Sequence, residues 1–336
     1  MRSDHVTPDS IAEAARALDN IVVRTPLLEA PWISDAVGGE VRLKCENLQR
    51  AGAFKIRGAY TMLARMPESE RRRGVVAYSS GNHAQGVALA AKLFGVKAVV
   101  VMPTTAPAVK QEGAARLGAE VILEGTTSMH RKVKAEAVAA ERGFAIVPAF
   151  DHPDIIAGQG TVAIEILEDW PAVEAIIVPV GGGGLVSGVA AWVKNTRPGV
   201  AVIGVEPANA DAMARSIAAG EPVTIESRPT IADGLMPVRP GDITFAHVRD
   251  FVDEIVLVSD DAIADATRRL LGASKLVVEF SGAATVAALL SGSFAARGKR
   301  CAAVLSGGNL DPVRAVSLLR DSSSAADATL VPAVSA

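Results

Sequence analysis

The sequence predicts an α/β fold with parallel sheets. Short aliphatic segments alternate along the chain with longer, alanine-rich segments of helical character. The aliphatic segments are apolar at consecutive positions, which is typical of strands that are covered on both faces. The helices between such strands supply the two covers, and alternation of this kind indicates the α/β architecture.

The first regular unit of this pattern spans about residues 75–150. A Val-Val-Ala-Tyr strand precedes a glycine-containing turn and an alanine-rich helical segment, and the second strand ends at Pro103. Because proline cannot donate to a strand ladder, it is a natural end for that strand. Strands are expected at residues 75–78, 98–102, 121–123 and 145–147, and helices at residues 84–94, 107–117 and 128–142.

A longer unit runs from residue 155 to about residue 318. We predict a large domain formed by residues 1–65 and 151–320, and a small mobile domain formed by residues 66–150. Ser, Ala and Asp dominate residues 321–336, which predicts a disordered tail. In the longer unit, strands are expected at residues 175–180, 202–205, 255–258 and 302–305, and a helix at residues 185–194.

The composition excludes several classes of partner. Lys and Arg (34) nearly balance Asp and Glu (37), so neither nucleic acid nor an anionic membrane is expected as a partner. No signal peptide is apparent, and no segment approaches the roughly 18 apolar residues of a membrane helix. Cys45 and Cys301 lack CxxC spacing, which favours buried thiols in a cytoplasmic protein and leaves a disulfide open. Aromatic residues make up only 4% of the chain, so Ala, Val, Leu and Ile must build the core.

Lys55 is the leading candidate for chemistry. It follows Phe54 and precedes a segment of helical character. A lysine amine is a useful nucleophile only when it is neutral, and burial or a nearby cation such as Arg57 would favour that form. A lysine in a charged stretch is otherwise usually a solvated side chain. Its role therefore depends on the other motifs of the chain.

Four consecutive glycines form the second candidate. Gly181, Gly182, Gly183 and Gly184 follow a predicted strand and precede a predicted helix that begins at Leu185. Converging N–H groups and the positive end of a helix suit a phosphate, although a flexible turn is the alternative. The run satisfies neither a G-x-G-x-x-G nor a Gly-Lys-Ser/Thr frame, so a monophosphate cofactor suits it better than a dinucleotide.

Two polar turns also follow predicted strands. Residues 79–83 offer hydroxyl, amide and N–H groups to a carboxylate, although an N-cap explains the serines equally well. Ser306 ends the last strand, where it could hydrogen-bond a heterocyclic nitrogen, and a plain two-glycine turn is the alternative. The members of the first turn are Ser79, Ser80, Gly81, Asn82 and His83.

Taken in this order, the motifs resemble the fold type II pyridoxal-phosphate enzymes, specifically the threonine dehydratase and serine racemase group. The resemblance covers about residues 10–318. It implies two open, twisted parallel-sheet domains with pyridoxal 5′-phosphate in the cleft between them. The motifs that carry it are Lys44-Cys45-Glu46-Asn47-Leu48-Gln49, Phe54-Lys55-Ile56-Arg57-Gly58-Ala59, Ser80-Gly81-Asn82-His83-Ala84-Gln85-Gly86, Gly181-Gly182-Gly183-Gly184-Leu185 and Ser306-Gly307-Gly308-Asn309.

The resemblance also implies roles for individual residues. Lys55 would form the Schiff base and then remove the substrate Cα proton, and residues 79–83 would hold the substrate carboxylate. Asn82 would contact the ring hydroxyl, and Ser306 would face the pyridine nitrogen as a neutral partner that favours elimination. The cofactor-binding residues implied are Phe54, Lys55, Asn82, Gly181, Gly182, Gly183, Gly184, Leu185, Glu279 and Ser306.

The activity implied is β-elimination that turns L-threonine or L-serine into a 2-oxo acid and ammonia. The chain stops too early for a regulatory domain after the catalytic one, which favours a catabolic role. A dehydratase of hydroxyectoine-utilisation or 3-hydroxyaspartate type is an alternative. Racemisation is another, because Ser80 occupies the position of the second acid/base of the racemases. Residues 232–235 and 239–245 resemble the dehydratases instead. From a different class, a non-catalytic amino-acid-binding protein is conceivable, and Lys55 argues against it.

The metal site of the racemase-like members is incomplete in this sequence. Glu206 and Ala210 match it, but Ala212 stands where a further carboxylate is expected, which weakens a Mg²⁺ or Ca²⁺ site and leaves a monovalent cation open. Arg131 aligns with an arginine that some relatives use near the substrate carboxylate, with a surface position as the alternative. The resemblance also leads us to expect a homodimer or homotetramer.

Overall fold

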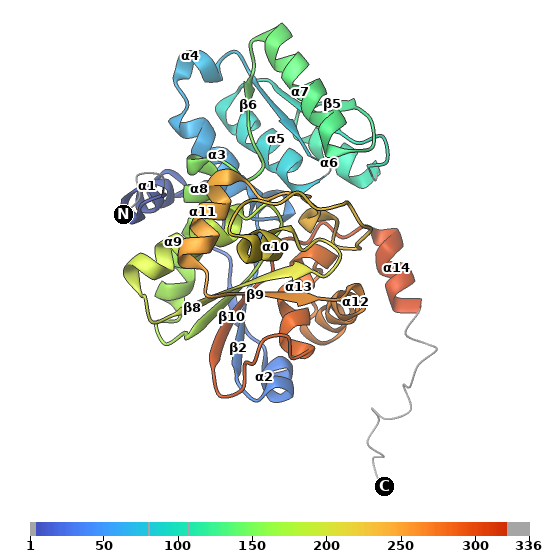
Figure 1. Cartoon of the computed structure of the whole chain (residues 1–336). Helices are drawn as coiled ribbons and strands as arrows, with labels where there is room; N and C mark the ends of the chain where they lie inside the picture. The colour runs from blue at the N-terminus through green and yellow to red at the C-terminus, as the bar shows by residue number, and fades with distance from the viewer. Residues whose placement is uncertain (1–4, 80, 107, 321–336) are drawn as a thin grey trace.

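The computed structural model describes residues 5–79, 81–106 and 108–320 (Figure 1). Two sheets flanked by helices confirm the predicted α/β class, with the smaller sheet in the upper part of the view and the larger in the lower part. Ser80 and the predicted tail at residues 321–336 lie outside the described residues. None of the described helices has both the length and the apolar character that a bilayer crossing requires.

The larger sheet has six strands in the order β1-β2-β10-β7-β8-β9. Neighbouring strands are parallel except β1 and β2, which are antiparallel. The first strands of the chain lie beside the last one, with Arg42 in register with Ala302. The strands are β1 (Leu27–Glu29), β2 (Glu40–Lys44), β7 (Ala175–Pro179), β8 (Ala201–Pro207), β9 (Glu254–Val258) and β10 (Arg300–Val304).

The smaller sheet has four parallel strands in the order β5-β4-β3-β6. Each of them matches a predicted strand to within a residue. The central strand β4 is buried at every position, as expected for a strand that helices cover on both faces. The strands are β3 (Val75–Tyr78), β4 (Ala98–Met102), β5 (Glu120–Leu123) and β6 (Ala145–Ile146).

Helices cover both sheets, and one of them contacts both units. Helix α3 packs against α5, which covers the smaller sheet, and against α8, which covers the larger one. The predicted domain boundary at residue 65 falls at the end of this shared helix and stays a prediction. The helices are α1 (Pro8–Ala17), α2 (Pro31–Val37), α3 (Lys55–Arg65), α4 (Glu68–Arg71), α5 (Asn82–Phe94), α6 (Ala108–Arg116), α7 (Ser128–Arg142), α8 (Pro153–Asp169), α9 (Gly184–Thr196), α10 (Ala212–Ala219), α11 (Asp242–Phe251), α12 (Asp260–Arg269), α13 (Phe280–Leu290) and α14 (Pro312–Arg320).

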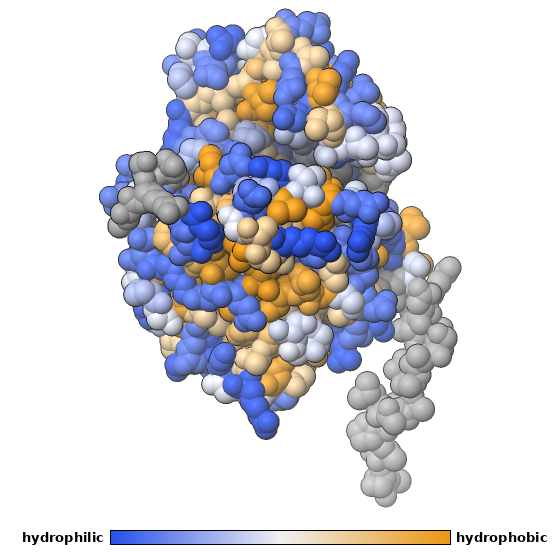
Figure 2. Space-filling model, viewed as in Figure 1, coloured by the Kyte–Doolittle hydropathy of each residue, from blue (hydrophilic) through white to orange (hydrophobic). Residues whose placement is uncertain are grey.

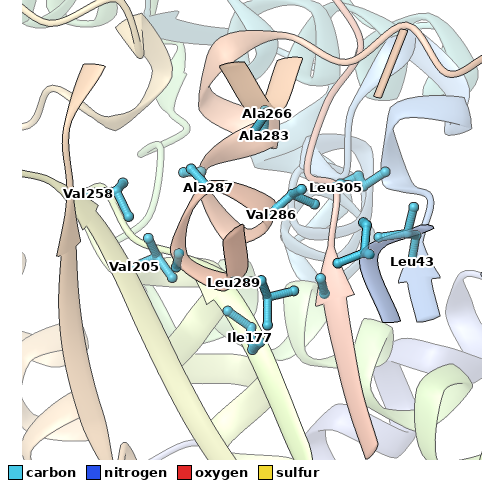
Figure 3. Close-up of a cluster of buried hydrophobic side chains, with 14 of the residues drawn as sticks. Leu43, Ile177, Val205, Val258, Ala266, Ala283, Val286, Ala287, Leu289 and Leu305 are labelled. Carbon is cyan, nitrogen blue, oxygen red and sulfur yellow. The ribbon is translucent and has the colours of Figure 1, made fainter. Parts of the chain in front are cut away.

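A large apolar cluster surrounds α13, which lies against one face of the six-stranded sheet (Figure 3). Alanines along this helix let it approach the strands closely, and branched aliphatic side chains fill most of the remaining space, with Phe280 and Phe294 as the buried aromatic members of the cluster. The predicted Ala, Val, Leu and Ile core is therefore confirmed. The labelled members of the cluster are Leu43, Ile177, Val205, Val258, Ala266, Ala283, Val286, Ala287, Leu289 and Leu305.

Both cysteines are buried and free, as predicted. Burial raises the pKa of the Cys45 thiol to about 12 and that of the Cys301 thiol to about 11. A thiol with such a pKa is hardly ionised at neutral pH and is a poor nucleophile. The cysteines therefore belong to the core and not to the chemistry of the protein.

Strands β1 and β2 escape the aliphatic pattern. Strand β2 has the sequence Glu-Val-Arg-Leu-Lys. Its charged residues interrupt the apolar pattern that would otherwise predict an inner strand of the sheet. The ammonium of Lys44 is fully buried and donates to the Thr25 carbonyl and the Glu165 carboxylate, and Arg42 lies over the Trp170 ring. Because these partners are distant in sequence, the strand becomes recognisable only in the folded protein.

Candidate active site

Lys55 begins α3 close to the end of β10. The N–H of Phe54 donates to the Ser306 carbonyl at 3.2 Å, and Ala53 forms an isolated antiparallel bridge with Gly307. These backbone contacts bring the predicted lysine motif beside the predicted serine turn. The Lys55 amine donates to the Ala149 carbonyl at 2.8 Å and lies 5.0 Å from the centre of the Phe54 ring.

The environment of Lys55 favours a neutral amine. Desolvation by burial lowers its pKa to about 8, against an opposing contribution from the nearby negative charge of Glu279. A substantial fraction of the amine is therefore unprotonated near pH 8, as a nucleophile or base requires. The prediction that Arg57 would help is wrong, because its guanidinium is engaged by two carboxylates and exerts no resolved effect on Lys55.

A buried ion network anchors the start of α3. Arg57 donates to Glu46 at 2.8 and 2.9 Å and to Glu165 at 2.7 Å, while Lys44 also donates to Glu165. Thr25 donates to Glu46 at 2.6 Å, which leaves its carboxylate fully hydrogen-bonded. The network joins β2, α3 and α8, and thereby fixes the helix turn that carries Lys55.

The glycine loop lies between β7 and α9, where the sequence predicts a phosphate site. A Cβ atom built on Gly182 would lie 2.2 Å from the Phe150 ring, and Gly183 has a φ of +95°, so glycine is required at both positions. Thr244 braces the loop from behind, since its hydroxyl donates to the Gly182 carbonyl at 2.7 Å. Within the described residues, no hydrogen bond takes the N–H groups of residues 181–185. These groups and the positive end of α9 are suited to bind an anion, as the sequence predicts, and the binding stays a prediction.

The loop at residues 79–83 joins β3 to α5. The N–H of Gly81 donates to the Ser79 hydroxyl at 3.3 Å. His83 is only 3% exposed, and its Nε2 atom donates to the Val147 carbonyl at 2.9 Å, which fixes the tautomer because a carbonyl only accepts. Burial, aided by the positive charge of Lys55, lowers the pKa of His83 to about 3. The imidazole is therefore neutral, and its Nδ1 atom has no partner among the described groups.

Asn82 connects the start of α5 to the other sheet. Its amide donates to the Glu279 carboxylate, and its carbonyl oxygen accepts from Asn309 at 2.9 Å. Asn309 also donates to the Ala51 carbonyl at 2.9 Å. Burial raises the pKa of Glu279 to about 7, with a further rise from the charge of Asp233 and a fall from that of Lys110. The motif predicted Asn82 and placed Glu279 nearby, but it gave no role to Asn309.

Ser306 follows the end of β10 and is 4% exposed. Its carbonyl is held by Phe54, so its position is fixed relative to Lys55. No hydrogen bond of its hydroxyl group occurs within the part of the chain that is described. This hydroxyl is therefore free to meet a polar atom of a bound group.

An ion pair that the motifs do not predict lies beside these loops. The ammonium of Lys110 in α6 donates to the carboxylate of Asp233, which begins the short helix η3 (Asp233–Leu235). The two residues are 123 positions apart, and neither belongs to a recognisable motif that pairs them. Only the folded chain brings them together.

Glu206 does not form a metal centre with the predicted partners. Its carboxylate accepts from the N–H groups of Met213 and Ala214 at 2.9 and 2.8 Å, which caps the start of α10. Burial raises the pKa of Glu206 to about 8, so the neutral acid is favoured at pH 7. The described residues contain no cluster of three metal-ligating side chains. Since Ala210 adds one carbonyl at most, this donor set does not fit a divalent ion.

Arg131 and the surface cavities lie outside the set of contacts around Lys55. Arg131 is half-buried in α7, and the hydrogen bond from its side chain to the Thr126 carbonyl is long at 3.4 Å. A cavity of about 360 Å³ is lined by residues 171–174, 196–200 and Arg300, at the opposite end of β7 from the glycine loop. The site is therefore identified by its polar groups and not by this cavity. Figure 2 shows one face of the protein, on which hydrophilic and hydrophobic residues are interspersed.

Comparison with known proteins gives a consistent result. Residues 18–307 match the family model described as pyridoxal-phosphate dependent enzyme. The L-threonine ammonia-lyase of Thermotoga maritima is 48% identical over 91% of this chain and 76% of its own length. The L-threo-3-hydroxyaspartate ammonia-lyase of Saccharomyces cerevisiae is 40% identical over 93% of this chain and 96% of its own. The structure of maize serine racemase superposes with a TM-score of 0.90 at 39% identity, and the match covers 94% of this chain and 98% of that one.

Proposed function

Because the chain belongs to the family of pyridoxal-phosphate dependent enzymes, we propose that it is an ammonia-lyase. It converts L-threonine, L-serine or both into a 2-oxo acid and ammonia by β-elimination. Relatives named for ammonia-lyase reactions support this assignment. The observation that carries it is the half-buried Lys55 amine, whose pKa is lowered to about 8 and which donates to the Ala149 carbonyl, next to the Phe150 ring that packs against Gly182.

The residues around Lys55 fit pyridoxal 5′-phosphate. The free N–H groups of residues 181–185 suit its phosphate, and the packing behind Gly182 excludes any larger residue there. Ser306 offers a hydroxyl and Asn82 an amide to the polar atoms of a ring. When bound, the cofactor supplies an electron sink for negative charge at the substrate Cα.

Lys55 serves first to hold the cofactor and then as a general base. The Ala149 carbonyl gives the free amine a fixed hydrogen-bond partner, so the lysine has a defined position when it does not hold the cofactor. A base with a pKa near the working pH combines a useful neutral fraction with a useful proton affinity. Lys55 therefore removes the proton at the substrate Cα.

The substrate carboxylate binds at residues 79–83. The start of α5 provides N–H groups and the positive end of a 13-residue helix, and Ser79 adds a hydroxyl. His83 can contribute its backbone N–H, because the free Nδ1 atom of its neutral imidazole is an acceptor and cannot donate to a carboxylate. Ser80 completes this loop in our proposal, although it lies outside the described residues.

Two other activities are retained as candidates. A dehydratase for a specialised hydroxy-amino acid of hydroxyectoine-utilisation or 3-hydroxyaspartate type is favoured by the hydroxyaspartate ammonia-lyase of yeast. Racemisation is favoured by the similarity to serine racemase and depends on Ser80. The size and polarity of the pocket around the β-substituent decide between L-threonine or L-serine and a specialised hydroxy-amino acid as the substrate of elimination. A Ser80→Ala variant should lose inversion at Cα and keep elimination.

The test of the proposal is release of 2-oxo acid from L-threonine, L-serine, D-serine and 3-hydroxyaspartate isomers in the presence of the cofactor. Rapid turnover of L-threonine or L-serine is expected. Lys55→Ala should lower kcat by at least about 10³-fold, because the general base and the covalent anchor are both removed. Lys92→Ala, a change at an exposed lysine of α5, is the matched control and should keep full activity.

Two results would contradict the assignment. Turnover by Lys55→Ala at the rate of the unaltered enzyme would remove the proposed mechanism. A protein that binds the cofactor and releases no 2-oxo acid from L-threonine or L-serine would instead move the assignment to a specialised substrate or to racemisation. Formation of D-serine from L-serine separates those two.

We also propose that the enzyme is a homodimer or homotetramer and that it works in the cytoplasm. The resemblance to the threonine dehydratase and serine racemase group leads us to expect an oligomer, and the buried free cysteines fit a reducing compartment. Light scattering coupled to gel filtration gives the mass directly. A mass near 34.6 kDa would correspond to a monomer and contradict the first part.

A further inference from the structure

The contact between Lys110 and Asp233 links the two sheet units beside the site, where the hydrogen bond between Asn82 and Glu279 also joins them. Lys110 lies in α6, which packs on β5 and α5 of the four-stranded unit. Asp233 begins η3, which lies between β8 and β9 in the chain and packs on α13 of the six-stranded unit. Lys110 is only 6% exposed, which is unusual for a lysine and is tolerated because its ammonium pairs with a carboxylate. We call these two residues the cross-layer ion pair.

On its Lys110 side, the cross-layer ion pair lies against the start of α5. A Cβ atom built on Gly81 would lie 3.2 Å from both the Cδ and the Nζ atoms of Lys110. The lysine stem therefore packs on the backbone of Gly81, next to Asn82. A displacement of the Lys110 side chain would remove the support of this backbone.

On its Asp233 side, the pair is fixed to the phosphate loop. A Cβ atom built on Gly181 would lie 3.2 Å from the Gly234 carbonyl oxygen and 3.2 Å from the Leu235 Cα atom. The N–H of Gly234 donates to the Ser281 hydroxyl at 2.8 Å, which ties η3 to the first turn of α13. Asp233 thus belongs to a segment that packs against the glycine loop and is hydrogen-bonded to α13.

The cross-layer ion pair consequently spans the distance between two parts of the proposed site. Gly81 at the start of α5 belongs to the part that receives the amino-acid carboxylate, and Gly181 belongs to the part that receives the phosphate. These parts come from different sheets, so the pairing within either sheet does not set their separation. The hydrogen bonds of Asn82 to Glu279 and Asn309 contribute to this separation, and the ion pair, with one partner on each side, adds a charged contact that also sets it.

We propose that Lys110 and Asp233 are positioning residues whose ion pair holds the carboxylate-binding end of α5 at the correct distance from the phosphate loop. The inference rests on the proposed function and assigns to it two residues that do not touch the reacting atoms. Loss of either charge lets the two units separate more easily. Part of the binding free energy of the amino acid is then used to bring them back together. The consequence appears in KM more than in kcat.

The test compares three variants in the cofactor-loaded enzyme. Lys110→Met keeps the stem that packs on Gly81 and removes the charge, and Asp233→Asn removes the opposite charge at nearly constant shape. Each should raise KM for the amino acid at least about tenfold and change kcat less than about threefold. Lys110→Arg keeps the positive charge and should keep KM within about threefold of the unaltered value.

A matched control is available within one unit. Lys194 pairs with Asp253 at 2.6 Å, and both residues belong to the six-stranded unit. Lys194→Met removes an ion pair of the same type without touching the contact between the units, so KM should not change. A similar rise of KM in this control would show that loss of any such pair is sufficient, and the positioning role would be rejected.

A second measurement distinguishes positioning from a general structural role. The charges that act on Glu279 are those of Lys110, Asp233 and Lys55, and the first two act in opposite directions. Lys110→Met should therefore raise the pKa of Glu279, and Asp233→Asn should lower it. Titration of the cofactor absorbance, which needs no turnover, should shift in opposite directions in the two variants. Equal shifts, or none, would overturn the assignment.

Hydrogen exchange separates failure of this inference from failure of the proposed function. Amides of α6 and of residues 231–235 should exchange faster in Lys110→Met than in the unaltered holoenzyme, whichever amino acid is the substrate. If the unaltered enzyme turns over none of the amino acids tested, the proposed function fails, yet this comparison still tests the ion pair. Unchanged exchange in both regions, together with unchanged KM, would reject the cross-layer role.

Discussion

At the scale of single residues, the site was largely predictable where backbone geometry or chemistry restricts the residue type. Lys55 and Asn82 belong to continuous motifs, and Gly182 is required by the ring packed behind it. Asp233 lies in the segment 232–235 that resembles the dehydratases, but nothing in the sequence pairs it with Lys110, because an ion pair between distant residues leaves no pattern. The expected help from Arg57 failed for the same reason, since its partners Glu46 and Glu165 become its neighbours only on folding.

The lowered pKa of Lys55 predicts a dependence of stability on pH. Its pKa is about 8 in the folded protein without cofactor, against an ordinary value of 10.5, so between these values the unfolded chain binds more protons. The free energy of unfolding therefore rises as pH increases from about 8 to about 10.5, and the cost of the buried charge is largest below pH 8. The gain is up to roughly 3 kcal/mol, and less where water screens the amine.

The measurement is urea unfolding of the cofactor-free protein between pH 7 and pH 11, compared with Lys55→Met at each pH. Other groups titrate in both proteins and cancel in the difference. The free energy of unfolding of the unaltered protein should rise relative to that of Lys55→Met as pH increases from about 8 to about 10.5. A difference that is constant over this range would mean that Lys55 has an ordinary pKa.

At the scale of elements, helix termini and strand ends form the site. The glycine loop connects β7 to α9, residues 79–83 connect β3 to α5, and Ser306 follows β10. Strand-turn-helix signals predict these places because the carboxyl ends of parallel strands are where ligands bind in such folds. Strand β2 was not predicted, since Arg42 and Lys44 interrupt the apolar pattern.

Gly182→Ala tests the packing behind the glycine loop. The added methyl group would lie 2.2 Å from the Phe150 ring, so the loop or the ring must move. We expect at least tenfold weaker binding of pyridoxal phosphate and a loss of about 1–3 kcal/mol in unfolding free energy. Titration of the absorbance of the bound cofactor measures the affinity.

The control for this change lies after the same helix. Gly199 follows α9, and no atom lies within 4 Å of a Cβ built there, so Gly199→Ala should leave cofactor affinity unchanged. Equal affinity for pyridoxal phosphate in Gly182→Ala and Gly199→Ala would show that the loop tolerates a side chain. The packing of Phe150 would then not be the reason for glycine at position 182.

At the scale of the whole molecule, the buried network of Lys44, Glu46, Arg57 and Glu165 joins the beginning of the chain to its middle. The sequence predicts the α/β class and the strands that are uniformly apolar, because burial on both faces leaves a local pattern. It does not predict this network, because each charge is tolerated in the core only through partners from other elements. The separation into two units follows from topology, and their relative mobility stays a prediction.

Glu46→Gln tests the importance of the network. It leaves the buried Arg57 guanidinium with one of its two carboxylate partners, so the free energy of unfolding should fall by about 3–5 kcal/mol. Because Arg57 and the other partners hold the pKa of Glu46 below its ordinary value, against the opposing effect of burial, the contribution is present above the unfolded pKa and is lost as pH falls. Urea unfolding at pH 7 and pH 4 measures both effects.

Glu68→Gln provides the comparison, because Glu68 forms an exposed ion pair with Arg72. This substitution should lower the free energy of unfolding by less than about 1 kcal/mol. Equal losses in the two variants would show that the buried network has no special place in the stability of the protein.

The position of β10 beside β2 has a consequence for synthesis of the chain. Ala51, close to Lys55, receives its hydrogen bond from Asn309, 258 positions later. At roughly 5–20 residues per second, a ribosome needs roughly 10–50 s to make that stretch. During this time the nascent chain has Lys55 but neither the last strand of the larger sheet nor the Ser306 carbonyl that holds Phe54. Lys55, the proposed catalytic residue, is thus among the first parts of the site to be made, and its surroundings are completed only after Asn309 has been added to the chain.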